Sequence, residues 1–247
     1  AKSLELRGRA ADTWSATLLS DDLNAVNAAK VRMVVSLPAD ADILLASYKP
    51  KLRSQIKKAE KNGLTASCTN EFSALQQFYD VYSKNMHRLG SPVHRFQWFE
   101  QLWQALHQSE RLFITLVYYS NKVVAAGLVL RCGHKACIPW ASTLAEFNHL
   151  APNMLLYWQI QAELANRGVS EFDMGRSTVG EGTYRFKAQW GAEPELLYWF
   201  HGSTNALALI NTSKQSKIRP IVEKVWQKLP LPIATRLGAY FRKYITL

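Results

Sequence analysis

The chain has 247 residues, of which 48% are hydrophobic, 11% aromatic and 20% charged. This composition predicts a globular protein with a substantial core and excludes a fibrous, low-complexity or disordered chain. The longest uninterrupted apolar run, residues 123–130, is far shorter than the roughly 20 residues that a membrane-spanning helix needs.

The net charge of +11 comes from 30 Lys and Arg against 19 Asp and Glu. Such an excess favours anionic partners, such as nucleic acid, nucleotide sugars or acidic lipid surfaces. Residues 201–247 hold eight of these cations but a single acid, Glu223. The three cysteines form a sparse, odd set, and the first residues lack the apolar core of a secretory signal. We therefore expect a cytoplasmic protein.

The first 37 residues have the pattern of short strands. Leu4 and Leu6 alternate with charged neighbours, residues 13–19 are strand-like, and residues 31–37 are rich in β-branched side chains. Strands without helices make a poor domain on their own. Because the chain also begins without Met, we expect an edge of a larger unit or the end of a first domain whose beginning is missing.

A strongly basic helix is predicted to begin at Pro50, which suits a first helical turn. Its cations follow one another at four-residue spacing and so share one face: Lys49, Arg53, Lys57 and Lys61. This stripe is either a solvated face or a surface that follows an anion.

Residues 64–200 predict an ordered series of strands and helices. Strands are expected at 64–69, 112–119, 123–130, 136–141, 169–174 and 196–200, and helices at 71–89, 96–107, 151–167 and 183–190. Two short turns join three of the strands, which requires antiparallel pairing. The predicted fold class is α/β (α+β), with a mixed, mainly antiparallel sheet flanked by helices.

The densest polar segment, residues 172–191, follows a short strand and continues into a helix. Open α/β sheets place their ligands at that position. Tyr184 and Lys187 share one face of the helix, whereas Phe186 and Trp190 share another. One face can therefore anchor the helix while the other meets a ligand.

Glycines and arginines in the same segment suit an anion. Gly180 and Gly182 bring backbone N–H groups close to the start of the helix, and Arg176 and Arg185 add charge. The loop can therefore hold a phosphate or stabilise an oxyanion. Its spacing matches neither a dinucleotide-binding motif nor a P-loop, so an ordinary loop with surface arginines is the equal alternative.

Two further segments carry polar side chains at element ends. Trp140 and Ser142 end the third antiparallel strand, and Asn153 and Tyr157 lie in the first turns of the long helix. For Tyr157, packing in the core is the first alternative, because helical aromatic residues usually bury themselves, and contact with a ligand is the second. Packing explains Asn153 less easily.

No metal site is expected. Cys132 and Cys137, with His134 between them, resemble part of a metal cluster, but a fourth ligand is missing and the segment has the pattern of a hairpin. The six histidines form no recognisable pair, and the motifs of common hydrolases and metalloproteases are absent.

The basic tail predicts two amphipathic helices. Their apolar residues repeat at helical spacing before and after two prolines: Ile218, Ile221, Val222, Val225, Trp226 and Leu229, then Ile233, Leu237, Tyr240, Phe241 and Tyr244. Such helices either pack back onto the domain or dock on an anionic membrane surface or a partner.

Five segments carry a family resemblance: residues 51–63, 138–142, 150–158, 172–176 and 184–191. They resemble FemAB-like proteins, especially the group associated with exopolysaccharide and PEP-CTERM/exosortase loci, and the element order resembles the GNAT acyltransferase fold. The similarity covers roughly residues 30–200, and residues 228–232 are similar to that group as well.

The resemblance implies a direct transfer reaction. Fem-type enzymes have two tandem GNAT-like domains and transfer an amino acid from aminoacyl-tRNA to an amine on a cell-wall precursor. By this resemblance Phe186 and Lys187 lie at the reaction centre, where a fixed cation stabilises an oxyanion by about 3 kcal/mol. Asp173 is the candidate base. Substrate binding is expected of the other residues singled out: Arg53, Trp140, Ser142, Asn153, Tyr157, Arg176, Tyr184, Arg185 and Phe186.

One departure from the family pattern concerns the acyl donor. GNAT enzymes that use acetyl-CoA carry a glycine-containing loop that binds pyrophosphate after the fourth strand, whereas residues 142–150 contain no glycine. We therefore expect aminoacyl-tRNA or another acyl donor rather than acetyl-CoA, and no metal or other cofactor.

Together these patterns predict an acyl or aminoacyl transferase for a cell-envelope or exopolysaccharide precursor, with tRNA and the inner membrane surface as further partners. The expected division is residues 1–37, the end of a first GNAT-like domain; 38–63, a basic connecting helix; 64–200, a GNAT-like domain; and 201–247, basic amphipathic helices. The alternatives are an acetyl-CoA-dependent acetyltransferase of polysaccharide and a non-catalytic module that binds RNA or a membrane surface.

Overall fold

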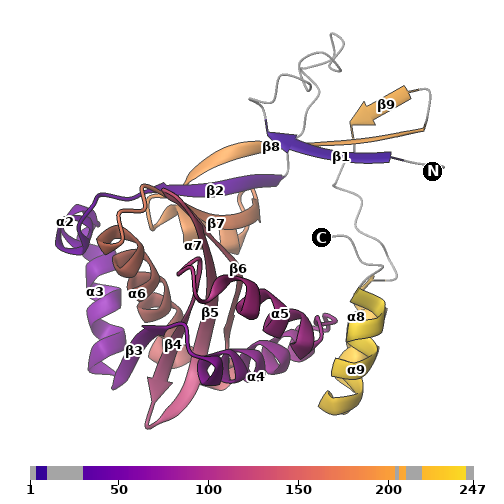
Figure 1. The fold of residues 1–247 in the computed structure, drawn as a ribbon, viewed down its shortest axis with the longest axis horizontal. Helices are drawn as coiled ribbons and strands as arrows, with labels where there is room; N and C mark the ends of the chain where they lie inside the picture. Colours follow the sequence, from indigo (N-terminus) through magenta and orange to yellow (C-terminus); the bar gives the residue numbers. More distant parts are fainter. Residues whose placement is uncertain (1–3, 10–29, 204–205, 210–218, 243–247) are drawn as a thin grey trace. The chain divides into compact units, whose positions relative to one another are not determined.

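The computed structural model describes residues 4–9, 30–203, 206–209 and 219–242 (Figure 1). The chain divides into two compact units, Ala1–Ser36 with Asp173–Ser216 and Leu37–Phe172 with Lys217–Leu247. The strand expected at residues 13–19, and Ile218 and Tyr244 of the tail pattern, lie outside the described residues. No helix within the described ranges is long and apolar enough to cross a membrane.

Four antiparallel strands form the sheet of the larger unit, in the order β6-β5-β4-β3. They are β3 (Leu64–Thr69), β4 (Leu112–Tyr119), β5 (Lys122–Cys132) and β6 (Lys135–Thr143). Between β4 and β5, Ser120 and Asn121 have φ angles of 47° and 65°, as two-residue hairpin turns require. The antiparallel pairing predicted from the short connections is confirmed.

Aromatic side chains of two helices form a hydrophobic core on one face of this sheet. The helices are α4 (Phe72–Arg88) and α5 (Phe96–Leu106). Phe78 of α4 stacks on Tyr82, with ring centroids 5.6 Å apart, and meets Phe99 of α5 at 5.4 Å. All three side chains are buried in one cluster with residues of β4 and β5.

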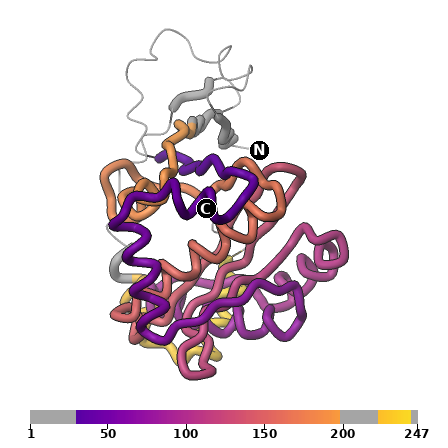
Figure 2. Tube along the Cα trace, turned by 90° about the vertical axis from the view of Figure 1, so that its left-hand side faces the viewer, coloured from indigo at the N-terminus to yellow at the C-terminus, as the bar shows by residue number. Residues whose placement is uncertain are grey.

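The opposite face of the sheet carries α6 (Pro152–Asn166), on which α2 (Ala41–Ser47) and α3 (Pro50–Lys61) pack (Figure 1, Figure 2). A Cβ atom on Gly127 of β5 would lie 3.2 Å from the Ile160 side chain of α6. The glycine therefore lets α6 approach the sheet closely. Alternation of side chains along each strand produces the two covered faces.

The two tail helices, α8 (Arg219–Gln227) and α9 (Leu231–Phe241), pack against α4. The Gln227 side chain donates a hydrogen bond to the Arg88 carbonyl oxygen at 2.8 Å. The expected packing of the tail onto the domain is thereby confirmed for its described residues, through one face of each helix.

Strands of the smaller unit lie in the order β1-β8-β2-β7. The elements of this unit are β1 (Leu4–Arg9), β2 (Lys30–Ser36), β7 (Glu171–Thr178), α7 (Gly182–Ala188), β8 (Glu193–Ser203) and β9 (Ala206–Leu209). The first two residues of β7 belong to the larger unit. β8 pairs antiparallel with β1, β2 and β9. The predicted fold class is confirmed, whereas the assignment of residues 1–37 to a separate first domain stays a prediction.

Candidate active site

β7 runs through Gly175, whose φ angle of +82° is irregular for a strand; we call this irregularity the Gly175 turn. Glycine adopts this conformation without the strain that other residues incur. In a regular strand successive carbonyl groups point to opposite edges. Here the carbonyl oxygens of Gly175 and Arg176 both accept hydrogen bonds from the Lys187 ammonium, at 3.0 and 2.8 Å. The turn thus directs two consecutive carbonyl groups at one cation.

Lys187, on α7, is only 8% exposed, and no other Lys or Arg is buried among the residues whose side chains the structure describes. Burial lowers the pKa of Lys187 from 10.5 to about 8, while the charge of Asp173 raises this pKa and that of Arg176 lowers it. An ammonium group has three N–H donors, and the third has no partner among the described residues. Lys187 can therefore donate a hydrogen bond to a substrate oxygen.

Asp173 supports the turn through both of its carboxylate oxygens. One accepts the Gly175 backbone N–H at 2.7 Å, and the other accepts Arg32 Nε at 2.8 Å. The Arg32 side chain, on β2, is 13% exposed and also lies 3.3 Å from Glu195. Arg32 was not singled out from the sequence. The sequence feature that could have indicated Arg32 is a charged residue between two apolar residues of β2, both of which are buried.

Other predicted residues of the smaller unit lie on or beside α7. Tyr184 is half-buried, whereas Arg176 and Arg185 are exposed. Phe186 meets the buried Trp190 edge to face, with ring centroids 6.3 Å apart. The prediction that these two residues lie on one face is confirmed, whereas the division into an anchoring face and a ligand-binding face stays a prediction. Both arginines are accessible to a substrate.

Anion binding by the loop between β7 and α7 stays a prediction. Gly180 has a φ angle of +80°. Apart from the adjacent residues, no atom of the described chain lies within 4 Å of the Cβ position at Gly180 or Gly182. Just before this loop, Ser177 is 4% exposed, and its hydroxyl has no hydrogen-bond partner among the described residues. Ser177 was also not singled out, because a single hydroxyl in a strand has no distinctive spacing.

A second group of predicted residues lies in the larger unit. Ser142, near the end of β6, is 3% exposed and accepts a hydrogen bond from Asn85 Nδ2 at 3.3 Å. The neighbouring Thr143 hydroxyl donates to Asn153 Oδ1 at the start of α6. One turn further along α6, Tyr157 is half-buried, and desolvation raises its pKa to about 12. Polar side chains therefore connect the end of β6 to the start of α6.

Trp140 and Arg53 occupy different surroundings in this unit. Trp140 packs edge to face against Phe99 and Trp98, with ring centroids 5.1 and 5.2 Å apart, so it belongs to the aromatic core. Arg53 and Lys57 line a groove of about 520 Å³ along α3. The groove is compatible with both alternatives for the basic stripe, a solvated face and an anion-binding face.

A 3-10 helix, η2 (Ala145–Leu150), follows β6 in the segment without glycine. It occupies the place in the chain where the acetyl-CoA-dependent pattern has its glycine-containing loop. In the part of the chain that the structure describes, no three His, Cys, Asp or Glu side chains are grouped so that they could hold a metal ion.

Comparison with known proteins extends the resemblance found in the sequence. The UDP-N-acetylmuramoylpentapeptide-lysine N(6)-alanyltransferase of Weissella viridescens is 23% identical over 163 residues, which cover 64% of this chain and 48% of that protein. The chain thus spans about half the length of this curated relative.

Solved structures show the same fold at low sequence identity. FemX has a TM-score of 0.59 and 14% identity, covering 79% of this chain and 64% of its own. L-PGS from Bacillus licheniformis has a TM-score of 0.51 and 12% identity, covering 81% and 65%. The match to the alanyltransferase, with the shared fold of FemX, confirms the FemAB-like resemblance. Residues 46–188, more than half of the chain, match the family described as Acetyltransferase (GNAT) domain, and the chain belongs to this family.

Proposed function

We propose that this chain carries the transfer site of an acyl or aminoacyl transferase. An amine or hydroxyl of a cell-envelope or exopolysaccharide precursor would attack the carbonyl carbon of an activated acyl donor. The observation that carries the proposal is the buried Lys187 ammonium, which two carbonyl groups hold while one N–H remains to donate. The name of the Weissella viridescens relative, an alanyltransferase acting on a lysine N6, supports this reaction class.

The proposed reaction forms one bond and breaks another. The acceptor atom bonds to the donor carbonyl carbon, and the resulting tetrahedral intermediate carries negative charge on the former carbonyl oxygen. Collapse of the intermediate breaks the bond to the donor, and the acceptor proton passes by way of the proposed base, Asp173, to the leaving group. A hydrogen bond from Lys187 to the oxyanion lowers the barrier by about 3 kcal/mol, and no covalent enzyme intermediate is needed.

Replacing Lys187 tests this role directly. We expect Lys187→Ala to lower kcat by about 10²–10³-fold, the effect of removing one oxyanion donor. Lys84→Ala is the matched control, because Lys84 is exposed on α4 and pairs with Asp80. Thermal unfolding of both variants would show that they are folded. Full transfer activity in Lys187→Ala would refute the proposed role.

Asp173 is the proposed base, and Asp173→Asn distinguishes that role from support of Lys187. Asparagine keeps an oxygen for the Gly175 N–H but loses the negative charge that raises the pKa of Lys187. If Asp173 is the base, Asp173→Asn should lower kcat at every pH at which the carboxylate is ionised. If Asp173 only supports Lys187, the variant should lower kcat most as the pH approaches 8. Measuring kcat between about pH 6 and 9 separates the two outcomes.

For the donor we propose aminoacyl-tRNA, because η2 provides no glycine-containing loop for a pyrophosphate group. Binding of an aminoacyl-tRNA mimic and of acetyl-CoA should be compared at near-physiological salt, since basic proteins bind polyanions non-specifically at low salt. We expect saturable binding of the mimic. Saturable binding of acetyl-CoA alone would favour the alternative, a polysaccharide acetyltransferase.

We propose substrate contacts for the other predicted side chains, each within its own unit. Beside Lys187, Arg176, Tyr184, Arg185 and Phe186 would bind substrate. In the larger unit the proposed contacts are Arg53, Trp140, Ser142, Asn153 and Tyr157. We propose a cytoplasmic location, where aminoacyl-tRNA is available, and an acceptor of the kind handled at exopolysaccharide and PEP-CTERM loci.

The basic groove on α3 favours a second candidate function, a non-catalytic module that binds RNA. Such a module would bind RNA with steep salt dependence and would keep that binding in Lys187→Ala. Transfer activity that disappears in Lys187→Ala would exclude it as the sole function.

A further inference from the structure

α9 packs on the protein through its small residues and exposes its large ones. Ala234 and Gly238 are buried, and a Cβ atom on Gly238 would lie 3.0 Å from the Val93 backbone nitrogen. The exposed fractions of its large apolar side chains are 48% for Ile233, 40% for Leu237, 52% for Tyr240 and 46% for Phe241. An amphipathic helix that only served the core would have the reverse arrangement.

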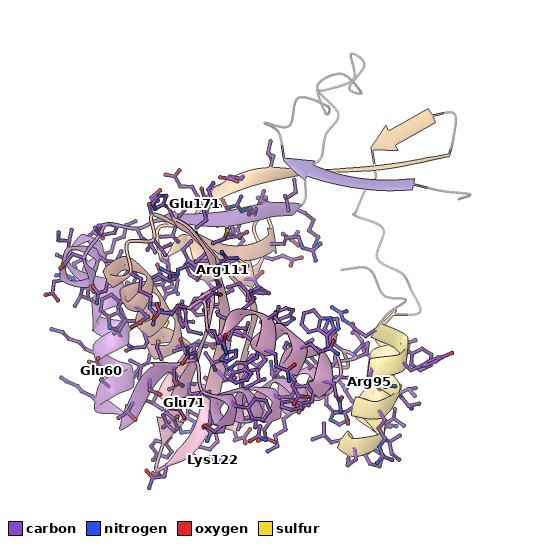
Figure 3. All side chains as sticks on the ribbon, viewed as in Figure 1. Glu60, Glu71, Arg95, Arg111, Lys122 and Glu171 are labelled. Atoms are coloured by element: carbon purple, nitrogen blue, oxygen red, sulfur yellow. The ribbon has the colours of Figure 1, made fainter. Side chains whose placement is uncertain are left out.

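The exposed apolar surface continues on α8. Val222 and Val225 are 52% and 60% exposed, and Trp226 meets Phe241 of α9 with ring centroids 6.4 Å apart. Figure 3 shows side chains of the α8–α9 pair pointing away from the rest of the larger unit. We call this surface, formed by Val222, Val225, Ile233, Leu237, Tyr240 and Phe241, the tail face.

Cations lie beside the tail face. Arg236 of α9 and Arg95, at the start of α5, line one groove of about 310 Å³ together with Tyr79 and Thr235. Figure 3 shows Arg95 on the side of the larger unit that meets α9. The exposed Lys224 and Lys228 add charge on α8, whereas the tail contains a single acid. An apolar surface edged by cations is thus continuous with a groove that two arginines line.

We infer that the tail face binds an anionic phospholipid surface. Its large side chains enter the boundary between headgroups and acyl chains, and the groove of Arg95 and Arg236 receives a headgroup phosphate. Helices that lie in this boundary have an apolar face edged by Lys and Arg. A second copy of the chain suits this face less well, because a two-fold interface would bring the same cations together. The inference does not depend on the reaction at Lys187.

Vesicle sedimentation of the full chain tests the inference. We expect binding to vesicles of phosphatidylglycerol and phosphatidylcholine in equal parts, weaker binding as salt is raised, and little binding to phosphatidylcholine alone. This measurement uses the unmodified chain, so its outcome does not rest on the folding of a variant. Absence of binding to the mixed vesicles would overturn the inference.

Paired variants assign the binding to the tail face. Leu237→Glu with Phe241→Glu should weaken vesicle binding by at least about tenfold, because two large side chains no longer enter the apolar region. The matched control, Ile43→Glu with Val179→Glu, changes the charge equally at two apolar residues that are 61% and 52% exposed elsewhere. Equal binding by the two double variants would overturn the inference.

The groove is tested by a smaller change. Arg236→Gln should weaken binding to the mixed vesicles about fivefold, the contribution of one cation at an anionic surface, whereas Lys51→Gln on α3 should leave it unchanged. Equal effects of the two changes would overturn the role of the groove.

Light scattering tests the competing arrangement, a dimer formed through the tail face. A dimer that Leu237→Glu with Phe241→Glu dissociates, without any vesicle binding, would identify the tail face as an interface between copies.

Discussion

The cation of Lys187 and the cations of α3 lie in opposite environments. Lys187 is buried and held by two carbonyl groups of β7, whereas Lys57 and Lys61 are exposed along α3. Burial makes the charge of Lys187 sensitive to pH near neutrality and strengthens its interaction with any charge that develops nearby. Water and salt screen the charges on α3.

This contrast separates two uses of positive charge in one basic protein. A single desolvated ammonium suits the stabilisation of a short-lived oxyanion, because its position is fixed before the reaction begins. Several exposed ammonium groups suit the loose, salt-dependent attraction of a polyanion. Net charge alone distinguishes neither use, since both contribute to the same +11.

The pH dependence of transfer should show the largest difference between the two regions. Above the pKa of about 8, Lys187 loses its proton, and kcat should fall about tenfold for each pH unit. Lys187→Arg should be slower but should lack this fall, because a guanidinium stays protonated. Lys57→Arg should keep the profile of the unmodified chain. A rate that rises through pH 8 would instead show that the neutral amine is the active form.

The pH dependence of the free energy of unfolding should also reflect the protonation of Lys187. Because the pKa of Lys187 is lower in the folded chain than its ordinary 10.5, the unfolded chain binds more protons between pH 8 and 10.5. The contribution of Lys187 to the free energy of unfolding should therefore increase over this interval, by about 3 kcal/mol at most. Chemical denaturation at a series of pH values would measure it. The increase should disappear in Lys187→Met, and an equal increase in that variant would contradict the assignment.

The Gly175 turn should matter for activity as well as for stability. Gly175→Ala places a side chain at a φ angle of +82°, which costs about 1–2 kcal/mol. It also disturbs the carbonyl groups that hold Lys187. Gly133→Ala is the matched control, because Gly133 has a φ angle of +57° in a hairpin, and apart from the adjacent residues no described atom lies within 4 Å of its Cβ position. We expect similar losses of thermal stability from both changes, and a loss of transfer activity from Gly175→Ala alone.

Much of the fold could be predicted from the sequence because local signals agree there. The predicted strands at residues 64–69 and 112–119 coincide with β3 and β4. β-Branched runs alternate with helical periodicity, and short polar turns separate them, so each boundary has a chemical signal. The polar segment around Lys187 was found for the same reason, since strand, glycines and helix follow one another closely.

The environment of Lys187 could not be predicted, because it depends on contacts between residues far apart in the chain. The φ angle of Gly175 directs two carbonyl groups at Lys187, and Arg32 reaches Asp173 across 141 positions of sequence. α9 gives a second case. Its apolar spacing predicted the helix, but the close approach at Gly238 decides which face packs inward.

The smallest expected effect concerns the exposed cations of α3. Lys57→Gln should change the free energy of unfolding by less than about 0.5 kcal/mol, because the side chain is exposed. If α3 contacts single-stranded RNA, the slope of log affinity against log salt should become shallower by about 0.7. Lys187→Gln should leave that slope unchanged, because a buried ammonium does not contact an RNA phosphate and so displaces none of the counterions condensed on the RNA. Equal slopes for the unmodified chain and Lys57→Gln would show that the basic stripe of α3 is a solvated face that does not bind RNA. In that case Lys187 would have a function and the exposed cations of α3 would have none, so the two regions would not simply bind different anions.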